Sequence, residues 1–271
     1  MILLLVDIGN TRVKWARLVA GQMGKQHAAA NAGWDASDYS RRVIGRGWSG
    51  SEDRIVVSSV AGKDANGLLT AAAREAGAPV PEFVASERSA AGITTEYLEP
   101  WRLGVDRFVG AIGAHHLASG QPVCVVNVGT AITIDLVDGT GRHHGGAIVP
   151  GPALMVGSLL TQTSGIRRRA TGGSAGVNGM FARSTRNAIG EGARYAAAAV
   201  VDRAIEESRI RLGSRPLVLL TGGGSADIKQ LIHSTSVRLP DLVLHGLAVW
   251  ARQTPAPVPR AHRSRKRGRV D

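Results

Sequence analysis

The stretch VDIGNTRVKW, residues 6–15, joins two runs of different character near the start of the chain. The apolar run at 2–6 is typical of a buried strand, and the run at 12–19 alternates apolar and polar side chains as a half-buried strand does. Gly9, Asn10 and Thr11 therefore predict the tip of a β-hairpin. Such a tip is either an ordinary turn or, because its backbone N–H groups point one way, a binding site for an anion.

The same plan returns 120 positions later, in VNVGTAITID at residues 126–135. Asn127 takes the place of Asp7, Gly129 takes the place of Gly9, and Thr130 follows as Thr11 does. Two such tips that face each other across a cleft would bind a polyphosphate between them, one tip at each end. The repeat therefore favours a phosphate site over a pair of unrelated turns.

Strand and helix patterns alternate along the whole chain, which specifies a layered α/β fold. Further strands are predicted at 54–60, 81–85, 145–151 and 216–221, and helices at 63–77, 104–118, 153–163, 183–208 and 241–252. We expect an N-terminal α/β domain at 1–116 and a C-terminal α/β domain at 117–254. The Gly- and Arg-rich run at 165–179 is expected to be mobile.

The formal net charge of +12 is concentrated partly in the last residues. Residues 255–271 lack apolar periodicity and are predicted to be a disordered basic tail, either a solvated terminus or a nonspecific contact for nucleic acid. The remaining positive charge suits anionic substrates. The single cysteine, Cys124, lies in an apolar run and excludes an internal disulfide. No stretch resembles a signal peptide or membrane span, so we expect a cytoplasmic protein.

Six motifs in order resemble those of type III pantothenate kinases, the family that includes the Bvg accessory factor relatives. They are DIGNTRVKW (7–15), Tyr97 seven residues before GVDR (104–107), GTAITID (129–135), GGAIVPG (145–151), STRNAIGEG (184–192) and TGGG (221–224). The resemblance runs from Met1 to about Arg252. It implies two similar ribonuclease H-like domains of the actin-like ATPase and sugar-kinase superfamily, with a nucleotide cleft between them. The implied activity is ATP-dependent phosphorylation of pantothenate to 4'-phosphopantothenate, the first step of coenzyme A biosynthesis.

The resemblance also implies roles for single residues. Asp106 matches the general base, although its local sequence is equally typical of an Asp that caps a helix. The implied substrate contacts are Tyr97, Gly104, Val105, Asp106 and Arg107, with Thr185 reaching the site from the neighbouring subunit of a homodimer. The implied ATP contacts are Asp7, Ile8, Gly9, Asn10, Thr11, Arg12, Val13, Lys14 and Thr130. Gly222 and Gly223 would let adenine or ribose lie against the backbone.

Two metal ions are expected in the cleft. Asp7 would hold Mg²⁺ through water, together with ATP. The family often has Asp where Asn127 stands, and there the carboxylate helps to bind K⁺ or NH₄⁺. Because Asn offers a carbonyl oxygen without a charge, we expect weaker dependence on the monovalent cation. The histidine pairs at 115–116 and 143–144 lack the spacing of a zinc site.

Two other functions stay open from the sequence. One is phosphorylation of a different small molecule by a kinase of the same superfamily. The other is a nucleic-acid-binding accessory regulator that uses the basic tail and keeps only a vestigial nucleotide site.

Overall fold

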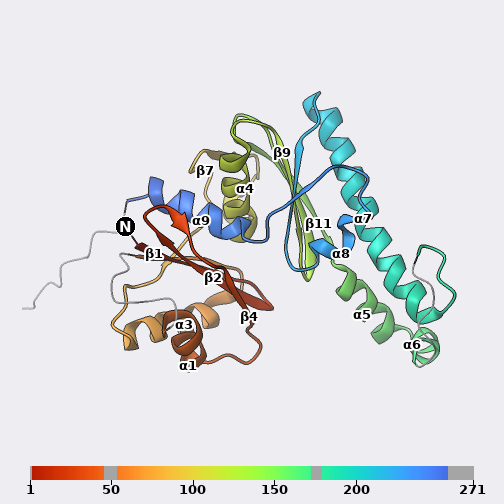
Figure 1. Ribbon diagram of the computed structural model, residues 1–271, viewed down its shortest axis with the longest axis horizontal. Coiled ribbons are helices and arrows are strands. Elements are labelled where there is room, and N and C mark those ends of the chain that lie inside the picture. The colour runs from red at the N-terminus through yellow and green to blue at the C-terminus, as the bar shows by residue number, and fades with distance from the viewer. Residues whose placement is uncertain (1, 46–53, 172–178, 256–271) are drawn as a thin grey trace, which may run out of the picture.

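Two mixed β-sheets form the framework of the protein, with helices between them and on their outer faces (Figure 1). The computed structural model describes residues 2–45, 54–171 and 179–255. The strands are β1 (Ile2–Ile8), β2 (Arg12–Val19), β3 (Gln22–Met23), β4 (His27–Ala30), β5 (Arg54–Ser59), β6 (Glu82–Phe83), β7 (Ser89–Ala90), β8 (Ile93–Thr95), β9 (Val123–Val128), β10 (Ala131–Val137), β11 (Arg142–Pro150), β12 (Leu217–Thr221) and β13 (Val237–Arg238).

Helices occupy most of the remaining described chain. They are α1 (Ala36–Tyr39), α3 (Gly62–Glu75), α4 (Val105–Ala118), α5 (Pro152–Gln162), α6 (Ser164–Ala170), α7 (Thr185–Leu212), α8 (Ser225–Lys229) and α9 (Leu242–Gln253), with a π turn η1 (Ser40–Ile44) and a 3₁₀ turn η2 (Pro100–Arg102). Within residues 2–45, 54–171 and 179–255, every helix is too short or too polar to cross a bilayer.

Both sheets are built around the same three-stranded unit. In the first sheet, β1 pairs antiparallel with β2 and parallel with β5. In the second sheet, β9 pairs antiparallel with β10 and parallel with β12. The two predicted hairpins are therefore confirmed, and each has a third strand beside it that begins far along the chain. As a result, Ser58 lies beside Asp7 and Thr221 lies beside Asn127.

Alternation along the strands divides the core into layers. In β1, the side chains of Leu4, Val6 and Ile8 belong to the cluster that contains α3, whereas Leu3 and Leu5 belong to the cluster that contains α9. The second sheet packs α7 on one face and α4 on the other. Because apolar residues occupy both faces of the central strands, each sheet is covered on both sides.

Helices α4 and α9 cross between the two sheets and connect them (Figure 1). Gly113 of α4 approaches α9 so closely that an added Cβ would lie 2.7 Å from the carbonyl oxygen of Leu242. A Cβ on Gly246 of α9 would overlap the carbonyl oxygen of Val109. Small residues allow this close backbone approach, and it brings the N-terminus of α4 to the space between the hairpins.

The predicted strands and helices are confirmed at all the segments named above. Residues 164–170, which include most of the Arg-rich part of the run expected to be mobile, form α6, and the mobility of the run stays a prediction. Residues 172–178 and the basic tail beyond 255 lie outside the described residues. The domain boundary after residue 116 stays a prediction, although β7 and β8 join the second sheet and α9 packs on the first.

Candidate active site

The two hairpin tips touch each other. Each tip is closed by a backbone hydrogen bond, from the Gly9 N–H to the Arg12 carbonyl at 2.9 Å and from the Gly129 N–H to the Ala131 carbonyl at 3.0 Å. The hydroxyl oxygens of Thr11 and Thr130 lie 2.8 Å apart. Residues separated by more than a hundred positions thus present hydroxyl and backbone groups to one space.

A cleft of about 200 Å³ lies at this contact and gathers most of the predicted nucleotide residues. Its lining consists of Asp7, Gly9, Asn10, Thr11, Arg12, Lys14, Val60, Asp106, Asn127, Gly129, Thr130, Ala131, Thr133, Gly222, Gly223 and Val243. The side chains of the predicted contacts Ile8 and Val13 are buried in the core instead. At Gly222 the backbone has φ +85° and an added Cβ would lie 2.5 Å from Asn127 Oδ1, so this turn requires glycine.

Asp106 stands in the first turn of α4, at the wall of the cleft. Its Oδ1 accepts a hydrogen bond from the backbone N–H of Arg107 at 2.9 Å. Burial raises the pKa of this carboxyl, against the opposing effects of the Arg107 N–H and guanidinium. A carboxylate with a raised pKa accepts a proton more readily, which is the property a general base needs.

Asp7 faces the same cleft from the end of β1. Burial raises the pKa of Asp7, Lys14 at 3.9 Å lowers it, Asp106 raises it and Ser58 lowers it, and together they bring the pKa to about 6. A buried carboxylate whose negative charge is only partly offset by its neighbours favours binding of a cation. The role of Asp7 in holding Mg²⁺ through water stays a prediction.

Asn127 occupies the matching position at the end of β9. Its neighbours in the sheet are Thr133 and Thr221, so the group offers only neutral oxygens. Across the described ranges, no group of three acidic, histidine or cysteine residues is placed to hold a metal ion. The side chains around Asn127 therefore fit a monovalent cation less well than a carboxylate would.

The predicted substrate contacts lie at different places. Gly104 precedes α4, and an added Cβ there would lie 2.8 Å from Asp106 Oδ1. Arg107 points away from the cleft lining and donates to Tyr97 Oη at 2.8 Å. Thr185 begins α7 in a separate hollow, together with Leu159 and Ile166. Their roles toward the substrate stay predictions.

Three polar residues behind Arg107 escaped the sequence reasoning. Asp135 pairs with the Arg107 guanidinium, His143 bonds Asp135, and Thr95 bonds His143. In β10, Thr133 and Asp135 alternate with the apolar Ile132 and Ile134, which is typical of a half-buried strand, but Arg107 of α4 covers Asp135 and buries it. The strand pattern could have pointed to this pair. If a sheet is covered on both sides, a charged side chain in its central strand is buried and needs a partner of opposite charge.

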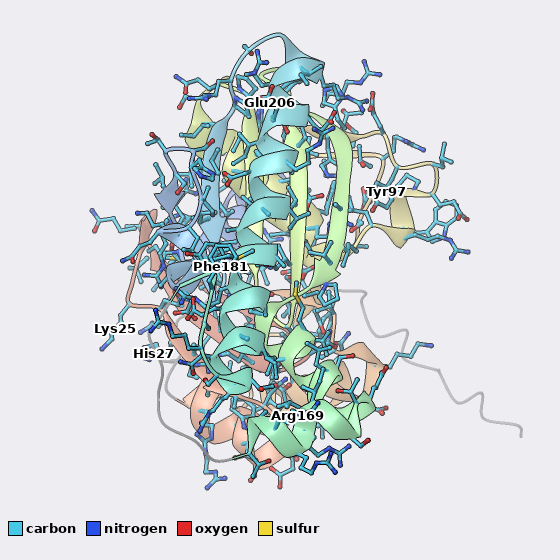
Figure 2. All side chains as sticks on the ribbon, turned by 90° about the vertical axis from the view of Figure 1, so that its right-hand side faces the viewer. Lys25, His27, Tyr97, Arg169, Phe181 and Glu206 are labelled. Carbon is cyan, nitrogen blue, oxygen red and sulfur yellow. The ribbon has the colours of Figure 1, made fainter. Side chains whose placement is uncertain are left out.

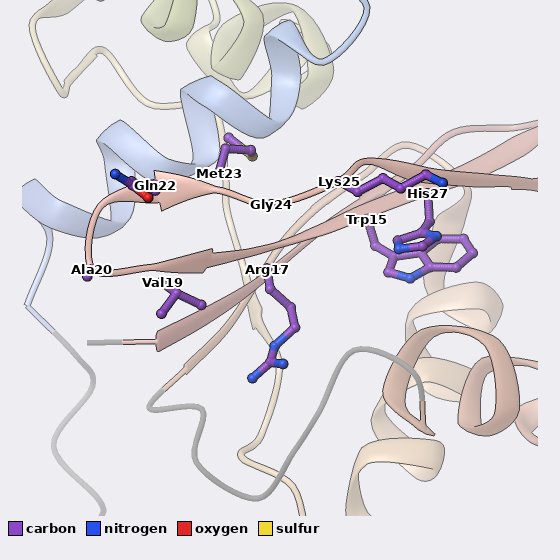
Figure 3. A pocket seen from close by; sticks show the side chains of 9 residues that line it. All are labelled: Trp15, Arg17, Val19, Ala20, Gln22, Met23, Gly24, Lys25 and His27. Carbon is purple, nitrogen blue, oxygen red and sulfur yellow. The ribbon is translucent and has the colours of Figure 1, made fainter.

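A second cavity, of about 490 Å³, lies beside β2 and β3 (Figure 3). Its lining includes Trp15, Arg17, Lys25 and His27, and Trp15 stacks on His27 with ring centroids 5.5 Å apart. None of the residues that line it carries a carboxylate, so the cleft at Asp106 is the better candidate for phosphoryl transfer.

Comparison with known proteins points to one family. The family model for type III pantothenate kinase matches residues 3–207. The chain is 34% identical to a type III pantothenate kinase from Nitrosococcus oceani over 258 residues, which cover 93% of this chain and 94% of that protein. It is 37% identical to one from Halorhodospira halophila over 255 residues, covering 92% and 97% of the two chains.

Solved structures show the same fold at low identity. A protein from Campylobacter jejuni described as a Baf family transcriptional activator aligns with a TM-score of 0.56 and 17% identity, over 90% of this chain and 94% of that one. Component A of (R)-2-hydroxyglutaryl-CoA dehydratase from Acidaminococcus fermentans aligns with a TM-score of 0.53 and 13% identity, over 93% and 96%.

We expect Asp7→Asn to stabilise the ligand-free protein at pH 8. The native pKa of Asp7, about 6, lies above its ordinary value of 3.8, so the parent loses stability as pH rises through this interval. The asparagine variant escapes that loss, and its melting temperature should exceed the parent's by several degrees at pH 8 and match it near pH 4.

The control is Asp138→Asn, for which the sign is reversed. Burial opposes ionisation of Asp138, but hydrogen bonds from Thr140 and His144 lower its pKa to about 2. That variant should melt below the parent at pH 8. A lower melting temperature for Asp7→Asn at pH 8 would contradict the assignment of a destabilising buried charge.

Proposed function

The chain belongs to the type III pantothenate kinase family, and we propose that it transfers the γ-phosphoryl group of ATP to the primary hydroxyl of pantothenate with Asp106 as general base. The product is 4'-phosphopantothenate, in the first step of coenzyme A biosynthesis. The observation that carries the proposal is the convergence of two glycine hairpin tips and the Asp106 carboxylate on one cleft.

In the proposed reaction, the tips hold the triphosphate through backbone N–H groups, the hydroxyls of Thr11 and Thr130, and Lys14. Asp106 accepts the proton of the pantothenate hydroxyl as its oxygen forms the new bond to the γ-phosphorus. The bond between that phosphorus and the β,γ-bridging oxygen breaks, and ADP leaves. Asp7 would hold Mg²⁺ through water, and the ion would supply positive charge to the phosphates. Positioning and charge stabilisation dominate such transfers, and the fixed tips provide both.

We expect Asp106→Asn to lower kcat by about 10²- to 10⁴-fold, because the amide cannot accept the proton. ADP release coupled to pantothenate, with sugars and short carboxylic acids offered beside it, measures the loss and tests the acceptor. Circular dichroism should show an unchanged fold.

Asp64→Asn is the matched control, since Asp64 also stands in the first turn of a helix but is exposed on α3. It should keep the parent's rate. Near-parental turnover by Asp106→Asn would overturn the assignment of the base. A parent that phosphorylates a sugar and leaves pantothenate unchanged would overturn the acceptor.

We also propose that the protein works in the cytoplasm, where ATP is abundant and the one cysteine, which is free and buried, stays reduced. Cell fractionation tests this. The alternative of a nucleic-acid-binding regulator depends on the basic tail, which lies outside the described residues, and no feature of the cleft favours it.

The monovalent cation is proposed to matter less here than in relatives with a carboxylate at position 127. We expect the parent to have nearly equal rates in KCl and NaCl, and Asn127→Asp to gain activation by K⁺, because the added charge would bind the ion. Initial rates over a salt series at constant ionic strength measure both. Steep, saturable activation of the parent by K⁺ over Na⁺ would refute the proposal.

A homodimer is proposed from the side of the molecule that carries α5, α6 and the start of α7, which faces the viewer in Figure 2. Helix α5 is apolar in sequence, yet none of its residues is buried. Leu154 and Leu159 of α5, Ile148 of β11 and Phe181 are all exposed. An apolar surface of this kind is typical of a protein interface. Thr185 lies beside it, where it could reach a partner's site.

Mixing two inactive variants tests whether sites are shared. If Thr185 serves the partner's site, a dimer of one Asp106→Asn chain and one Thr185→Arg chain has one intact site and one doubly altered site. Because about half of the dimers in an equal refolded mixture are of this kind, about a quarter of the parental sites should be recovered. Coupled ADP release measures the recovery, and light scattering measures the mass. A monomer, or a mixture as inactive as its components, would contradict the composite site.

A further inference from the structure

A buried ion pair lies directly behind the proposed base, and the proposed reaction does not use it. The guanidinium of Arg107 donates from Nε to both oxygens of Asp135, at 3.2 and 3.0 Å, and from Nη2 to Oδ1 at 2.6 Å. The two side chains are only 4% and 3% exposed. Asp135 thus accepts hydrogen bonds from the whole Nε–Nη2 edge of the guanidinium, and this two-point contact fixes the plane of the group.

His143 supports Asp135 from the neighbouring strand. The ring is fully buried, with Nε2 2.8 Å from Asp135 Oδ1 and Nδ1 2.9 Å from the Thr95 hydroxyl. The neutral ring protonated at Nε2 satisfies every group, because it donates to Asp135 and accepts from Thr95. The Thr95 oxygen in turn accepts from the backbone N–H of Tyr97 at 3.2 Å.

Tyr97 closes the ring of contacts. Its hydroxyl accepts from Arg107 Nη1 at 2.8 Å, its ring lies 5.6 Å from the Arg107 guanidinium carbon, and it stacks on His143 at 6.0 Å between centroids. Arg88 also donates to the backbone carbonyl of Tyr97 at 2.8 Å. The half-buried side chain that is expected to meet the substrate is therefore held through its hydroxyl, its ring and its backbone.

We propose that Asp135 and His143 are positioning residues for the acceptor substrate, and that they act by fixing Arg107 and Tyr97 in the geometry that receives it. This inference rests on the proposed function and deepens it. Because Asp135 neutralises Arg107 and holds its Nε and Nη2, only Nη1, which donates to Tyr97 Oη, is left for a substrate carboxylate. Nη1 would act there as an oriented donor rather than as part of a mobile cation. The same Arg107 supplies the backbone N–H that holds Asp106, so the ring also connects the acceptor site to the base.

Steady-state kinetics of Asp135→Asn and His143→Leu test the proposal. We expect KM for pantothenate to rise roughly 10- to 100-fold, because misplaced contacts to the substrate cost that much. KM for ATP should stay close to that of the parent, since the hairpin tips are untouched. His143→Gln should retain most of the parent's pantothenate KM, because its amide N–H replaces the Nε2 donor to Asp135.

Glu82→Gln is the matched control for a merely structural role. Glu82 pairs with Arg54 in the first sheet through a similar buried two-bond contact, at 2.8 and 2.7 Å. Its loss should lower the melting temperature as Asp135→Asn does, with both KM values unchanged. If Asp135→Asn behaves as this control does, or raises both KM values alike, the positioning role is wrong.

Hydrogen exchange separates this inference from the proposed function. The Tyr97 amide and the first turn of α4 should exchange faster in Asp135→Asn than in the parent, and not in Glu82→Gln. If the parent fails to phosphorylate pantothenate, the proposed function falls, while faster exchange still supports the ring as the device that fixes Tyr97 and Arg107. Unchanged exchange at both places would overturn it.

Discussion

The close crossing of α4 and α9 at their glycines is the constraint on which the rest of the structure depends. Helix α4 belongs to the core of the second sheet and α9 to that of the first, so their contact sets the distance between the hairpin tips. Gly113 and Gly246 permit backbone contact that no larger residue would allow. With the helices further apart, Thr11 and Thr130 would separate and Asp106 would leave the cleft.

Two buried carboxylates, Asp135 and Asp7, lie near that crossing, and they differ in how fully hydrogen bonds and positive charges offset their negative charge. Asp135 receives three donors from Arg107 and His143, and is therefore held in one arrangement. Asp7 is compensated less fully, by Lys14 at 3.9 Å and Ser58, and burial still leaves its pKa raised. Incomplete compensation is costly in a folded chain but leaves a group ready to bind a ligand. The fully compensated charges of Arg107 and Asp135 thus lie outside the cleft lining, and the less compensated carboxylates of Asp7 and Asp106 lie in it.

Local patterns predicted the hairpins, the glycine turns and most helices, because the spacing of apolar residues that marks a strand or a helix can be recognised within one short segment of sequence. They could not predict the contact between the tips, which needs the packing of α4 on α9. They could not predict the burial of Asp135 for the same reason: the helix that buries it, α4, is supplied from elsewhere in the chain. The resemblance to a family pointed to Asp106, whose local sequence alone is equally that of a helix cap. Its position beside both tips is information that only the fold contains.

The repeated three-stranded unit has a consequence for how the cleft could diverge. The two hairpin units meet through the hydroxyls of Thr11 and Thr130 and form a pseudo-symmetric pair. A symmetric pair of this kind would present the same groups at both ends of the cleft. ATP has no such symmetry, since its triphosphate terminates in a reacting phosphorus at one end and a nucleoside at the other. The two copies differ at the matching position, since the first has a carboxylate at its strand end, Asp7, and the second has an uncharged amide, Asn127. A nucleotide bound between them would therefore meet different groups at its two ends.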